Sequence, residues 1–275
     1  MQFLMFSKML QQLSVAEAGE AIARLGFDGV DLTVREKGHV LAENVTRDLP
    51  RAVEVLRDQG LIVGMITTSL TSADQPHAEA VFATAAQCGI RFLKLGYWLY
   101  QGFGSVRRQI DEIRAEVKGL ESLALKHGIT AAIHTHSGNF MSASPFVCSQ
   151  LIEGTDPVAI GLYVDAGHTV LEGGYGVWRQ SLDFVSDRIC LLAAKSFGWF
   201  PEPNGATGRV GWKPKLLPFD KGMTDWREIL GMLKSVGFDG YVSVHSEYSE
   251  LSLAELLQQT AADFALLKSA AAHAG

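Results

Sequence analysis

The stretch GFDGVDL at residues 26–32 and the stretch GFDGYVSV at residues 237–244 nearly repeat each other. In both, a glycine follows a polar, periodic segment and precedes a short run that is apolar at most positions. Glycine is common directly after a helix, because the left-handed conformation there strains any residue with a Cβ. Short runs of this kind are typical of strands buried on both faces of a parallel sheet. Each stretch therefore predicts the end of a helix followed by a buried strand.

The same pattern recurs along the chain and gives eight strand candidates. Gly60, Gly89 and Gly128 precede the runs LIVGMI, IRFLKLG and ITAAIH, and three more apolar runs lie at residues 3–6, 160–164 and 189–194. Helical patterns lie between them, at Val15–Leu25 after a Ser14–Glu17 capping box, at Ser105–His127, at Trp226–Val236 after Asp225, and at Ser252–Ala272. Alternating strands and helices predict the α/β class, and eight units favour a (β/α)8 TIM barrel that forms a single domain over residues 1–275.

An open, doubly wound parallel sheet is the alternative architecture. It loses support because neither GxGxxG nor GxxxxGK[ST] follows the first strand, so the sequence also predicts no nucleotide cofactor. The longest stretch without a regular pattern is Gly198–Lys221, which is rich in proline and glycine. A loop of that length in a compact domain is usually functional. We expect it to fold over the mouth of the barrel and to bring Trp199 or Trp212 near it.

Composition and charge narrow the classes of protein. Hydrophobic residues make up 47% of the chain and charged residues 20%, which is ordinary for a globular protein with a large core. The formal net charge of −6 argues against a nucleic-acid partner, which would require a basic surface. The N-terminus does not have the pattern of a signal peptide, no apolar run is long enough to span a bilayer, and Cys88, Cys148 and Cys190 form no CxxC pair. These features predict a cytoplasmic protein that binds neither nucleic acid nor a membrane, and they leave a homo-oligomer open.

Histidines and carboxylates gather where three of the predicted strands end, namely His134, His136, Asp165, His168, His245 and Glu247. The carboxyl ends of the strands of a (β/α)8 barrel converge on one mouth, so these side chains should line one cavity. His134 and His136 are two residues apart and share one face of an extended strand. Neutral imidazole and carboxylate groups suit a divalent metal ion, and the same groups suit acid–base catalysis without a metal.

Lysine and aromatic side chains are expected at the same mouth. Lys195 ends the seventh strand, where it can hold an oxyanion or a phosphate, and Lys94 lies within the fourth strand, where an inward charge needs a partner. His39 lies in the second strand–helix loop, within reach of the mouth. Aromatic rings pack well against the apolar faces of sugars. The predicted substrate-binding residues are His168, Lys94, Trp98, His39 and Trp199.

Over nearly its whole length the sequence resembles the xylose isomerase-like barrels, which include sugar and sugar-phosphate isomerases and epimerases and the inosose dehydratases. The resemblance rests on GFDGVDL at residues 26–32, DAGH at 165–168, PFDKGMTDW at 218–226 and VSVHSEY at 242–248. It implies a TIM barrel fold and an active site at the carboxyl ends of the strands. It does not identify a substrate.

The resemblance also implies a divalent metal held by Glu, Asp, His and Glu side chains from strands five to eight. Asp165 matches the aspartate, and His168 matches the histidine three residues after it. His134 replaces the first glutamate, as in the His-rich fifth strand of inosose dehydratases, Ala193 replaces the histidine of a seventh-strand His-x-Lys pattern, and His245 replaces the last glutamate. The predicted ligands of a zinc, manganese, cobalt or nickel ion are therefore His134, Asp165 and His245.

Together these features predict an isomerase or epimerase of a sugar or polyol, phosphorylated or not, that moves a proton next to a carbonyl. Glu247 or His136 would transfer the proton, and a metal or a cationic cluster containing Lys195 would stabilise the enediolate. An inosose dehydratase-like lyase is an alternative, because its reaction also begins with proton abstraction beside a carbonyl. A non-catalytic sugar-binding barrel that has lost its metal is an alternative of another class, and Ala193 supports it. The acidic net charge disfavours an apurinic endonuclease.

Overall fold

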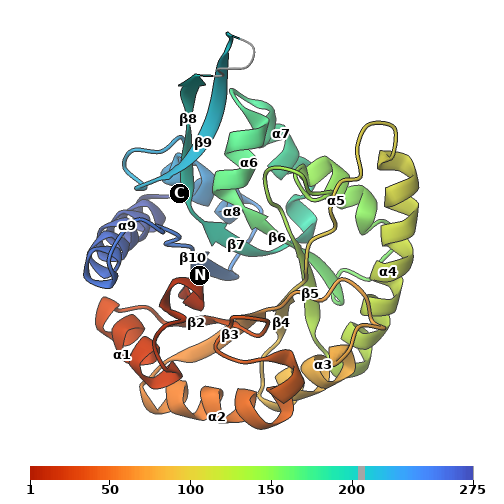
Figure 1. Ribbon diagram of the computed structural model, residues 1–275, viewed down its shortest axis with the longest axis vertical. Coiled ribbons are helices and arrows are strands. Elements are labelled where there is room, and N and C mark those ends of the chain that lie inside the picture. The colour runs from red at the N-terminus through yellow and green to blue at the C-terminus, as the bar shows by residue number, and fades with distance from the viewer. Residues whose placement is uncertain (204–207, 275) are drawn as a thin grey trace.

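Eight parallel strands close into a barrel in the computed structural model, which describes residues 1–203 and 208–274 (Figure 1). The order around the barrel is β1-β10-β7-β6-β5-β4-β3-β2, so neighbours in sequence are neighbours in space. The strands are β1 (Gln2–Phe6), β2 (Gly29–Thr33), β3 (Ile62–Thr67), β4 (Phe92–Lys94), β5 (Thr130–His134), β6 (Ile160–Asp165), β7 (Ile189–Ala194) and β10 (Tyr241–Val244). The predicted barrel is confirmed, and the open sheet is excluded.

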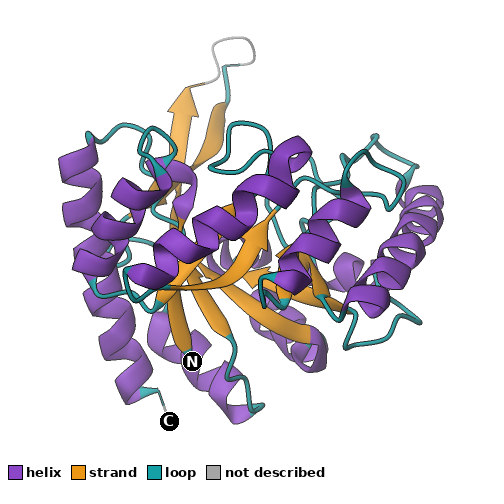
Figure 2. Ribbon diagram, turned by 90° about the horizontal axis from the view of Figure 1, so that it is seen from below, coloured by secondary structure: helices purple, strands orange, loops and turns teal. Residues whose placement is uncertain are grey.

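Helices form a ring outside the barrel, as Figures 1 and 2 show. In the described residues they are α1 (Val15–Leu25), α2 (Val45–Asp58), α3 (Ala78–Gln87), α4 (Val106–His127), α5 (Pro145–Leu151), α6 (Ala166–Gly173), α7 (Val177–Phe184), α8 (Trp226–Ser235) and α9 (Leu253–His273), with short 3-10 helices at Ser7–Leu10, Ala42–Asn44 and Ser186–Arg188. The predicted capping box is present at the start of α1, where Ser14 and Glu17 bond each other's backbone amides. Gly26 ends this helix with φ 80°, which a residue with a Cβ would adopt only under strain. None of the helices in the described ranges has the length and apolar run that crossing a bilayer would require.

The core has two parts, because each strand is buried on both faces. The larger part packs the outer faces of the strands against the helices. A smaller, separate cluster is made only of strand residues, as expected for a filled barrel interior, and consists of Leu4, Met65, Ala132, Tyr163, Leu191 and Ala193. This layer closes the barrel from below, so polar side chains can face an open space only near the carboxyl ends of the strands.

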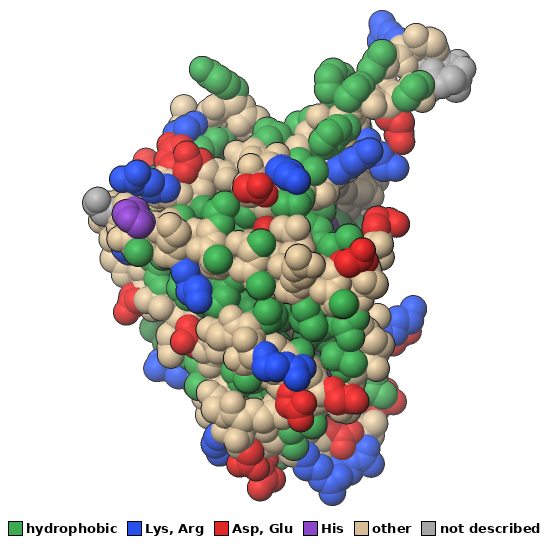
Figure 3. Space-filling model, turned by 90° about the vertical axis from the view of Figure 1, so that its left-hand side faces the viewer, with side chains coloured by type: hydrophobic (Ala, Val, Ile, Leu, Met, Phe, Trp, Pro, Cys, Tyr) green, Lys and Arg blue, Asp and Glu red, His purple; other side chains and the backbone are tan. Residues whose placement is uncertain are grey.

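The stretch 198–221, expected to be an irregular lid, instead contains most of a β-hairpin. Its strands are β8 (Ser196–Pro203) and β9 (Val210–Leu217), which pair antiparallel from Ser196–Leu217 to Pro203–Val210. The prolines do not prevent this pairing, because both strands of an isolated ribbon are edge strands and a missing N–H can face solvent. The hairpin projects away from the barrel (Figures 1 and 3). Trp199 and Trp212 are 41% and 65% exposed and do not line the barrel cavity, so the predicted lid is wrong.

Candidate active site

A cavity with an empty volume of about 390 Å³ opens at the carboxyl ends of the barrel strands. Six of the predicted site residues line it, namely Lys94, His134, His136, Lys195, His245 and Glu247. Their convergence follows from the fold, because His134 ends β5 and Lys195 and His245 directly follow β7 and β10. The predicted position of the site in the barrel agrees with this cavity.

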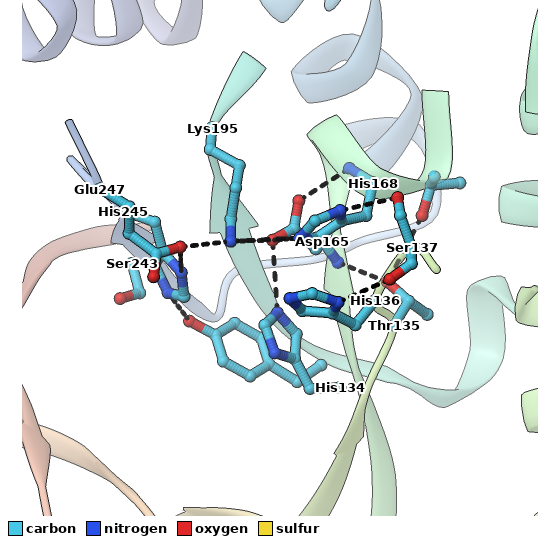
Figure 4. Close-up of polar contacts among 12 residues, drawn as sticks. His134, Thr135, His136, Ser137, Asp165, His168, Lys195, Ser243, His245 and Glu247 are labelled. Carbon is cyan, nitrogen blue, oxygen red and sulfur yellow. Dashed lines mark hydrogen bonds and ion pairs between the residues drawn. The ribbon is translucent and has the colours of Figure 1, made fainter. Parts of the chain in front are cut away.

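The Lys195 ammonium lies at the centre of a buried charge cluster (Figure 4). Its Nζ is 2.7 Å from Glu247 Oε2, 3.2 Å from Asp165 Oδ2 and 3.3 Å from His168 Nε2. Burial alone would lower the pKa of Lys195, but the charges of Asp165 and Glu247 outweigh it and raise this pKa above its ordinary value. The ammonium thus has hydrogen-bond acceptors in Glu247 and His168 and an ion pair with Asp165, so Lys195 is a fixed positive charge.

The two carboxylates of the cluster are held ionised. Burial raises the pKa of Asp165 and of Glu247, but the positive charge of Lys195 outweighs it, so both pKa values are lowered, that of Glu247 well below its ordinary value. Glu247 Oε1 also accepts a hydrogen bond from Lys8. The other oxygen of Asp165 accepts a 3.0 Å bond from the backbone amide of His168 and so caps the start of α6. Neither carboxylate is therefore a ready proton acceptor.

His168 stands behind Lys195 and does not line the cavity. Burial places the pKa of His168 well below its ordinary value, so the ring is neutral. Because its Nε2 accepts from the Lys195 ammonium, Nδ1 carries the proton and donates to the Ser137 hydroxyl at 2.8 Å. His168 thus positions the lysine and is not placed to touch a substrate.

A chain of hydrogen bonds orients His245 from below. Asp31, fully buried within β2, accepts bonds from Thr67 Oγ1 at 2.7 Å, from Ser243 Oγ at 2.9 Å and from the Tyr163 hydroxyl at 3.3 Å. The Tyr163 oxygen is 2.8 Å from His245 Nε2. Since Tyr163 donates its proton to the carboxylate, His245 must donate its Nε2–H to the Tyr163 oxygen. The Nδ1 atom of His245 then carries a lone pair, and it has no hydrogen-bond partner among the described residues.

His134 and His136 form the opposite wall. His134 Nδ1 is 2.7 Å from the Tyr97 hydroxyl, while its buried Nε2 has no hydrogen-bond partner in the described structure and lies 3.4 Å from Asp165 Oδ2. Burial, followed by the charge of Lys94, lowers the pKa of His134 well below its ordinary value. Burial also lowers the pKa of His136, whose Nδ1 is 2.9 Å from the Ser137 carbonyl. Both rings are therefore neutral.

Lys94 enters the cavity from β4 without an acidic partner. The side chain is 2% exposed, and its Nζ lies 3.5 Å from the centroid of the Tyr97 ring. Within the described residues no hydrogen bond or ion pair reaches this Nζ. Burial, followed by the charge of Arg35, lowers the pKa of Lys94 well below its ordinary value. Lys94 thus differs sharply from Lys195, whose charge is fully paired.

Besides His168, three more predicted substrate-binding residues do not line the cavity. Both ring nitrogens of His39 are occupied, Nδ1 at 3.3 Å from Thr33 Oγ1 and Nε2 at 3.2 Å from the Leu10 carbonyl. Trp98 packs against the hydrophobic core, and Trp199 lies on the projecting hairpin. The sequence places these residues near the ends of strands, but that position does not determine whether their rings point into the cavity.

Several groups in or just below the cavity had not been assigned a role from the sequence, namely Tyr163 and Arg35, which line it, and Asp31, which lies below it. A signal for Asp31 was available, because a carboxylate inside the apolar run GFDGVDLT is costly to bury unless it is hydrogen-bonded. Tyr163 carried a weaker signal, since a tyrosine within a buried strand usually has a partner for its hydroxyl. Arg35 carried none, because it lies in a loop among other polar residues.

The three predicted metal ligands do not form a metal centre. The described part of the chain has no group of three or more His, Cys, Asp or Glu side chains arranged to hold a metal ion. His245 directs Nε2 to Tyr163, and its ring centroid is 5.7 Å from that of His134. The Asp165 oxygen nearest His134 also lies beside the Lys195 ammonium. A divalent ion bound there would meet a fixed positive charge, so these residues do not fit a divalent metal.

Residues 20–270 match the family model described as "Xylose isomerase-like TIM barrel". The chain belongs to this family. No curated protein matches it in sequence. The family resemblance inferred from the sequence motifs is thereby confirmed.

Solved structures of low sequence identity share the fold over nearly their whole length. The 3-keto-D-glucoside 4-epimerase YcjR from E. coli has a TM-score of 0.73 at 13% identity, with 98% of this chain and 99% of that chain covered. The probable 3-DHS dehydratase AsbF from Bacillus anthracis has a TM-score of 0.70 at 17% identity, covering 98% and 99%. A xylose isomerase-like TIM barrel protein from Mycobacterium smegmatis, in complex with magnesium, has a TM-score of 0.70 at 18% identity, covering 98% and 97%. This chain thus shares its fold with an epimerase, a probable dehydratase and a protein in complex with magnesium.

Proposed function

We propose that this protein is an isomerase or epimerase of a sugar or polyol that moves a proton at the carbon next to a carbonyl. The observation that carries this proposal is His245, which lines the same cavity as Lys94 and whose ring is held by the chain from Asp31 through Tyr163. Its Nδ1 has no hydrogen-bond partner among the described residues and lies 3.8 Å from Glu247 Oε2. Proton abstraction beside a carbonyl requires a base on one side of the carbon and stabilisation of the developing oxyanion on the other. The epimerases among the structural relatives support this reaction class.

His245 is the proposed base. Its Nε2–H is fixed by Tyr163, and the buried carboxylate of Asp31 stabilises the positive charge that the ring acquires when Nδ1 takes a proton. A histidine supported by a tyrosine and an aspartate follows the same logic as a histidine oriented by a carboxylate in a catalytic triad. Glu247, one of the two bases expected from the sequence with His136, is less suited, because Lys195 and Lys8 hold its pKa low.

Lys94 and the Tyr97 hydroxyl are the proposed groups on the substrate oxygen. Lys94 Nζ is free of protein acceptors, so its N–H groups are available to the carbonyl and to the enediolate oxygen formed from it. Lys195 also lines the cavity, but its charge is balanced by Asp165 and Glu247. This chemistry uses side chains of the chain itself and no divalent ion.

A lyase that eliminates water after the same first step is the second candidate, since the dehydratase AsbF shares the fold. His134 favours it in one respect, because its ring lines the cavity and its Nε2, which lies 3.4 Å from Asp165 Oδ2, makes no hydrogen bond in the described structure. This nitrogen can assist a leaving hydroxyl. The two reactions differ in product mass, since an epimerase conserves the mass of its substrate and a lyase releases water.

The test is deuterium wash-in from D₂O across a panel of ketoses, aldoses, keto-sugars and inososes, followed by mass spectrometry. We expect one class of substrate to gain a deuteron at the carbon beside the carbonyl and to conserve its carbon skeleton and oxygens. His245→Gln should lower the exchange rate by about 10²- to 10⁴-fold, and Tyr163→Phe should lower it by less while changing the pH profile. Loss of water from the substrate would show that the protein is a lyase. Deuterium exchange at an unchanged rate in His245→Gln would show that His245 is not the base.

A further inference from the structure

The cavity concentrates positive charge in a chain whose net charge is negative. In the described structure four cationic side chains line it, Lys8, Arg35, Lys94 and Lys195, beside a single carboxylate, Glu247. The formal net charge of the whole chain is −6. Composition therefore does not account for this excess of cations around the site.

Two of the four cations are neutralised by the protein. Lys195 has Asp165 and Glu247 as partners, and Lys8 donates to Glu247. Asp31, just below the cavity, accepts from three hydroxyl groups and forms no ion pair with either of the remaining cations. Each carboxylate around the site thus already has partners within the protein, and in the described structure none forms an ion pair with the other two cations.

Lys94 and Arg35 have no such partner. The Arg35 guanidinium is half-buried and lies 5.8 Å from the centroid of the Phe6 ring, and neither it nor Lys94 Nζ is in a hydrogen bond or an ion pair within the described residues. Arg35 lies close enough to Lys94 for its charge to act on that lysine. A buried cation without a partner is costly and is seldom retained unless a ligand supplies the opposite charge.

Resting on the proposed function, we propose that the substrate is an anionic sugar, carrying a carboxylate or a phosphate, and that Lys94 and Arg35 bind this group. Both side chains line the cavity and are free of protein acceptors, so an anion placed between them completes the charge balance of the site. The planar guanidinium of Arg35 presents paired donors to a carboxylate or a phosphate, and the Lys94 ammonium adds a point charge. The neutral hydroxyls of the sugar then face the histidine walls.

Equilibrium binding tests this proposal without any turnover. Calorimetric titration would compare aldonates, uronates and sugar phosphates of five and six carbons, each with its neutral parent sugar, and inorganic phosphate alone. We expect at least one anionic sugar to bind about tenfold more tightly than its neutral parent, or better, since hydrogen bonds to charged groups contribute that much. A preference for acids or for phosphates identifies which anion the site takes.

Substitutions test whether Lys94 and Arg35 bind the anionic group of the sugar. Arg35→Gln should reduce the preference for the anion while the neutral parent sugar binds as before. Lys94→Met also removes a proposed contact to the carbonyl oxygen, so it should weaken binding of both sugars and of the anionic one more. Lys268→Met is the matched control, because Lys268 also lies over an aromatic ring, 4.3 Å from the centroid of Phe264, on the outer helix α9. It should leave the preference unchanged. If Lys94→Met folds poorly, Arg35→Gln alone still allows the affinities for the anionic sugar and its neutral parent to be compared, because Arg35 lies in a loop.

The proposal is overturned if the neutral sugars bind as tightly as the anionic ones, if none of the anionic sugars binds, or if the preference survives undiminished in both variants. Failure of the proposed function is a separate result, since a protein that prefers anionic sugars but exchanges no deuterium would retain the binding site and lose the reaction.

Discussion

Lys195 determines what ions the site can hold. The side chain reaches into the space between Asp165 and Glu247, where carboxylates would otherwise attract a metal ion. Position 193, where the resemblance implies a histidine ligand, is alanine and belongs to the apolar layer of the barrel. The ammonium paired with two carboxylates and the missing histidine ligand both disfavour a metal ion, so one lysine provides the positive charge that a divalent ion would provide.

Removing this lysine should therefore create a metal site. We expect chelator-treated wild-type protein to show no saturable binding of Zn²⁺ or Mn²⁺ in calorimetric titration, and Lys195→Ala to bind one of them. Without metal the variant should lose about 3–5 kcal/mol of stability, because two buried carboxylates are left unpaired. Added metal should restore part of the lost Tm.

Lys195→Arg serves as the control for this experiment, since it keeps the positive charge and should bind neither ion. Saturable metal binding by the wild type, with Asp165→Ala abolishing it, would contradict the assignment of Lys195 as the cation of the site.

The β8–β9 hairpin is the element that departs most from the rest of the barrel. Its backbone groups pair within the ribbon, and only its base touches the site, where Phe197 lies 4.7 Å from the ring centroid of His168. Beyond Gly198 and Lys215, which face each other in the ladder, the ribbon extends away from the barrel (Figure 1). An element connected in this way has little influence on the cavity.

Truncating the hairpin should leave the barrel and its cavity intact. Residues 199–214 can be replaced by an Asn-Gly turn, because such turns close a two-stranded ladder. We expect the free energy of unfolding to change by about 1 kcal/mol or less and sugar binding to stay within twofold of wild type, roughly the variation seen for surface changes. Urea unfolding and calorimetric titration measure both. Loss of sugar binding in a folded truncation would give the ribbon a role at the cavity.

At the scale of the whole molecule, sequence patterns predicted the architecture well because it depends on local features. Glycine caps such as Gly26, apolar runs and the capping box at Ser14 each involve a few adjacent residues. The same patterns placed His134, Asp165 and His245 at strand ends, as the structure does. The hairpin was missed because proline content argues against strands only where the partner strand needs the N–H.

Predictions of the site chemistry were less successful, for a physical reason. The direction in which His245 presents its nitrogens depends on Tyr163 and Asp31, which are 82 and more than 200 residues away in sequence. Likewise, the position of the Lys195 ammonium depends on Asp165 and Glu247 together. Spacing along one strand carries no information on such contacts between strands.

The buried charge cluster should limit the pH range of stability. Asp165 and Glu247 have lowered pKa values, so their contribution is complete above their unfolded pKa values of about 4 and is lost as the pH falls through the folded values. Lys195 has a raised pKa, so its contribution is complete below its unfolded pKa of about 10.4 and is lost as the pH rises through the folded value. The stability difference between wild type and Lys195→Met should therefore be largest near neutral pH and shrink below about pH 4.

Urea unfolding from pH 3 to pH 8 measures this difference. The control is Lys213→Met, which removes an exposed ion pair with Glu202 and should change stability by less than about 1 kcal/mol at every pH. A difference for Lys195→Met that is as large at pH 3 as at pH 7 would show that the lysine stabilises through packing and not through charge.

Asp165 has one oxygen in the charge cluster and the other on the first turn of α6. The carboxylate that pairs with Lys195, a residue that lines the cavity, thus also accepts the bond from the buried amide of His168. We expect a ligand that changes the pairing of Lys195 with Asp165 to change the stability of this turn as well. Hydrogen exchange at the single amide of His168 should therefore differ between the free and the ligand-bound protein.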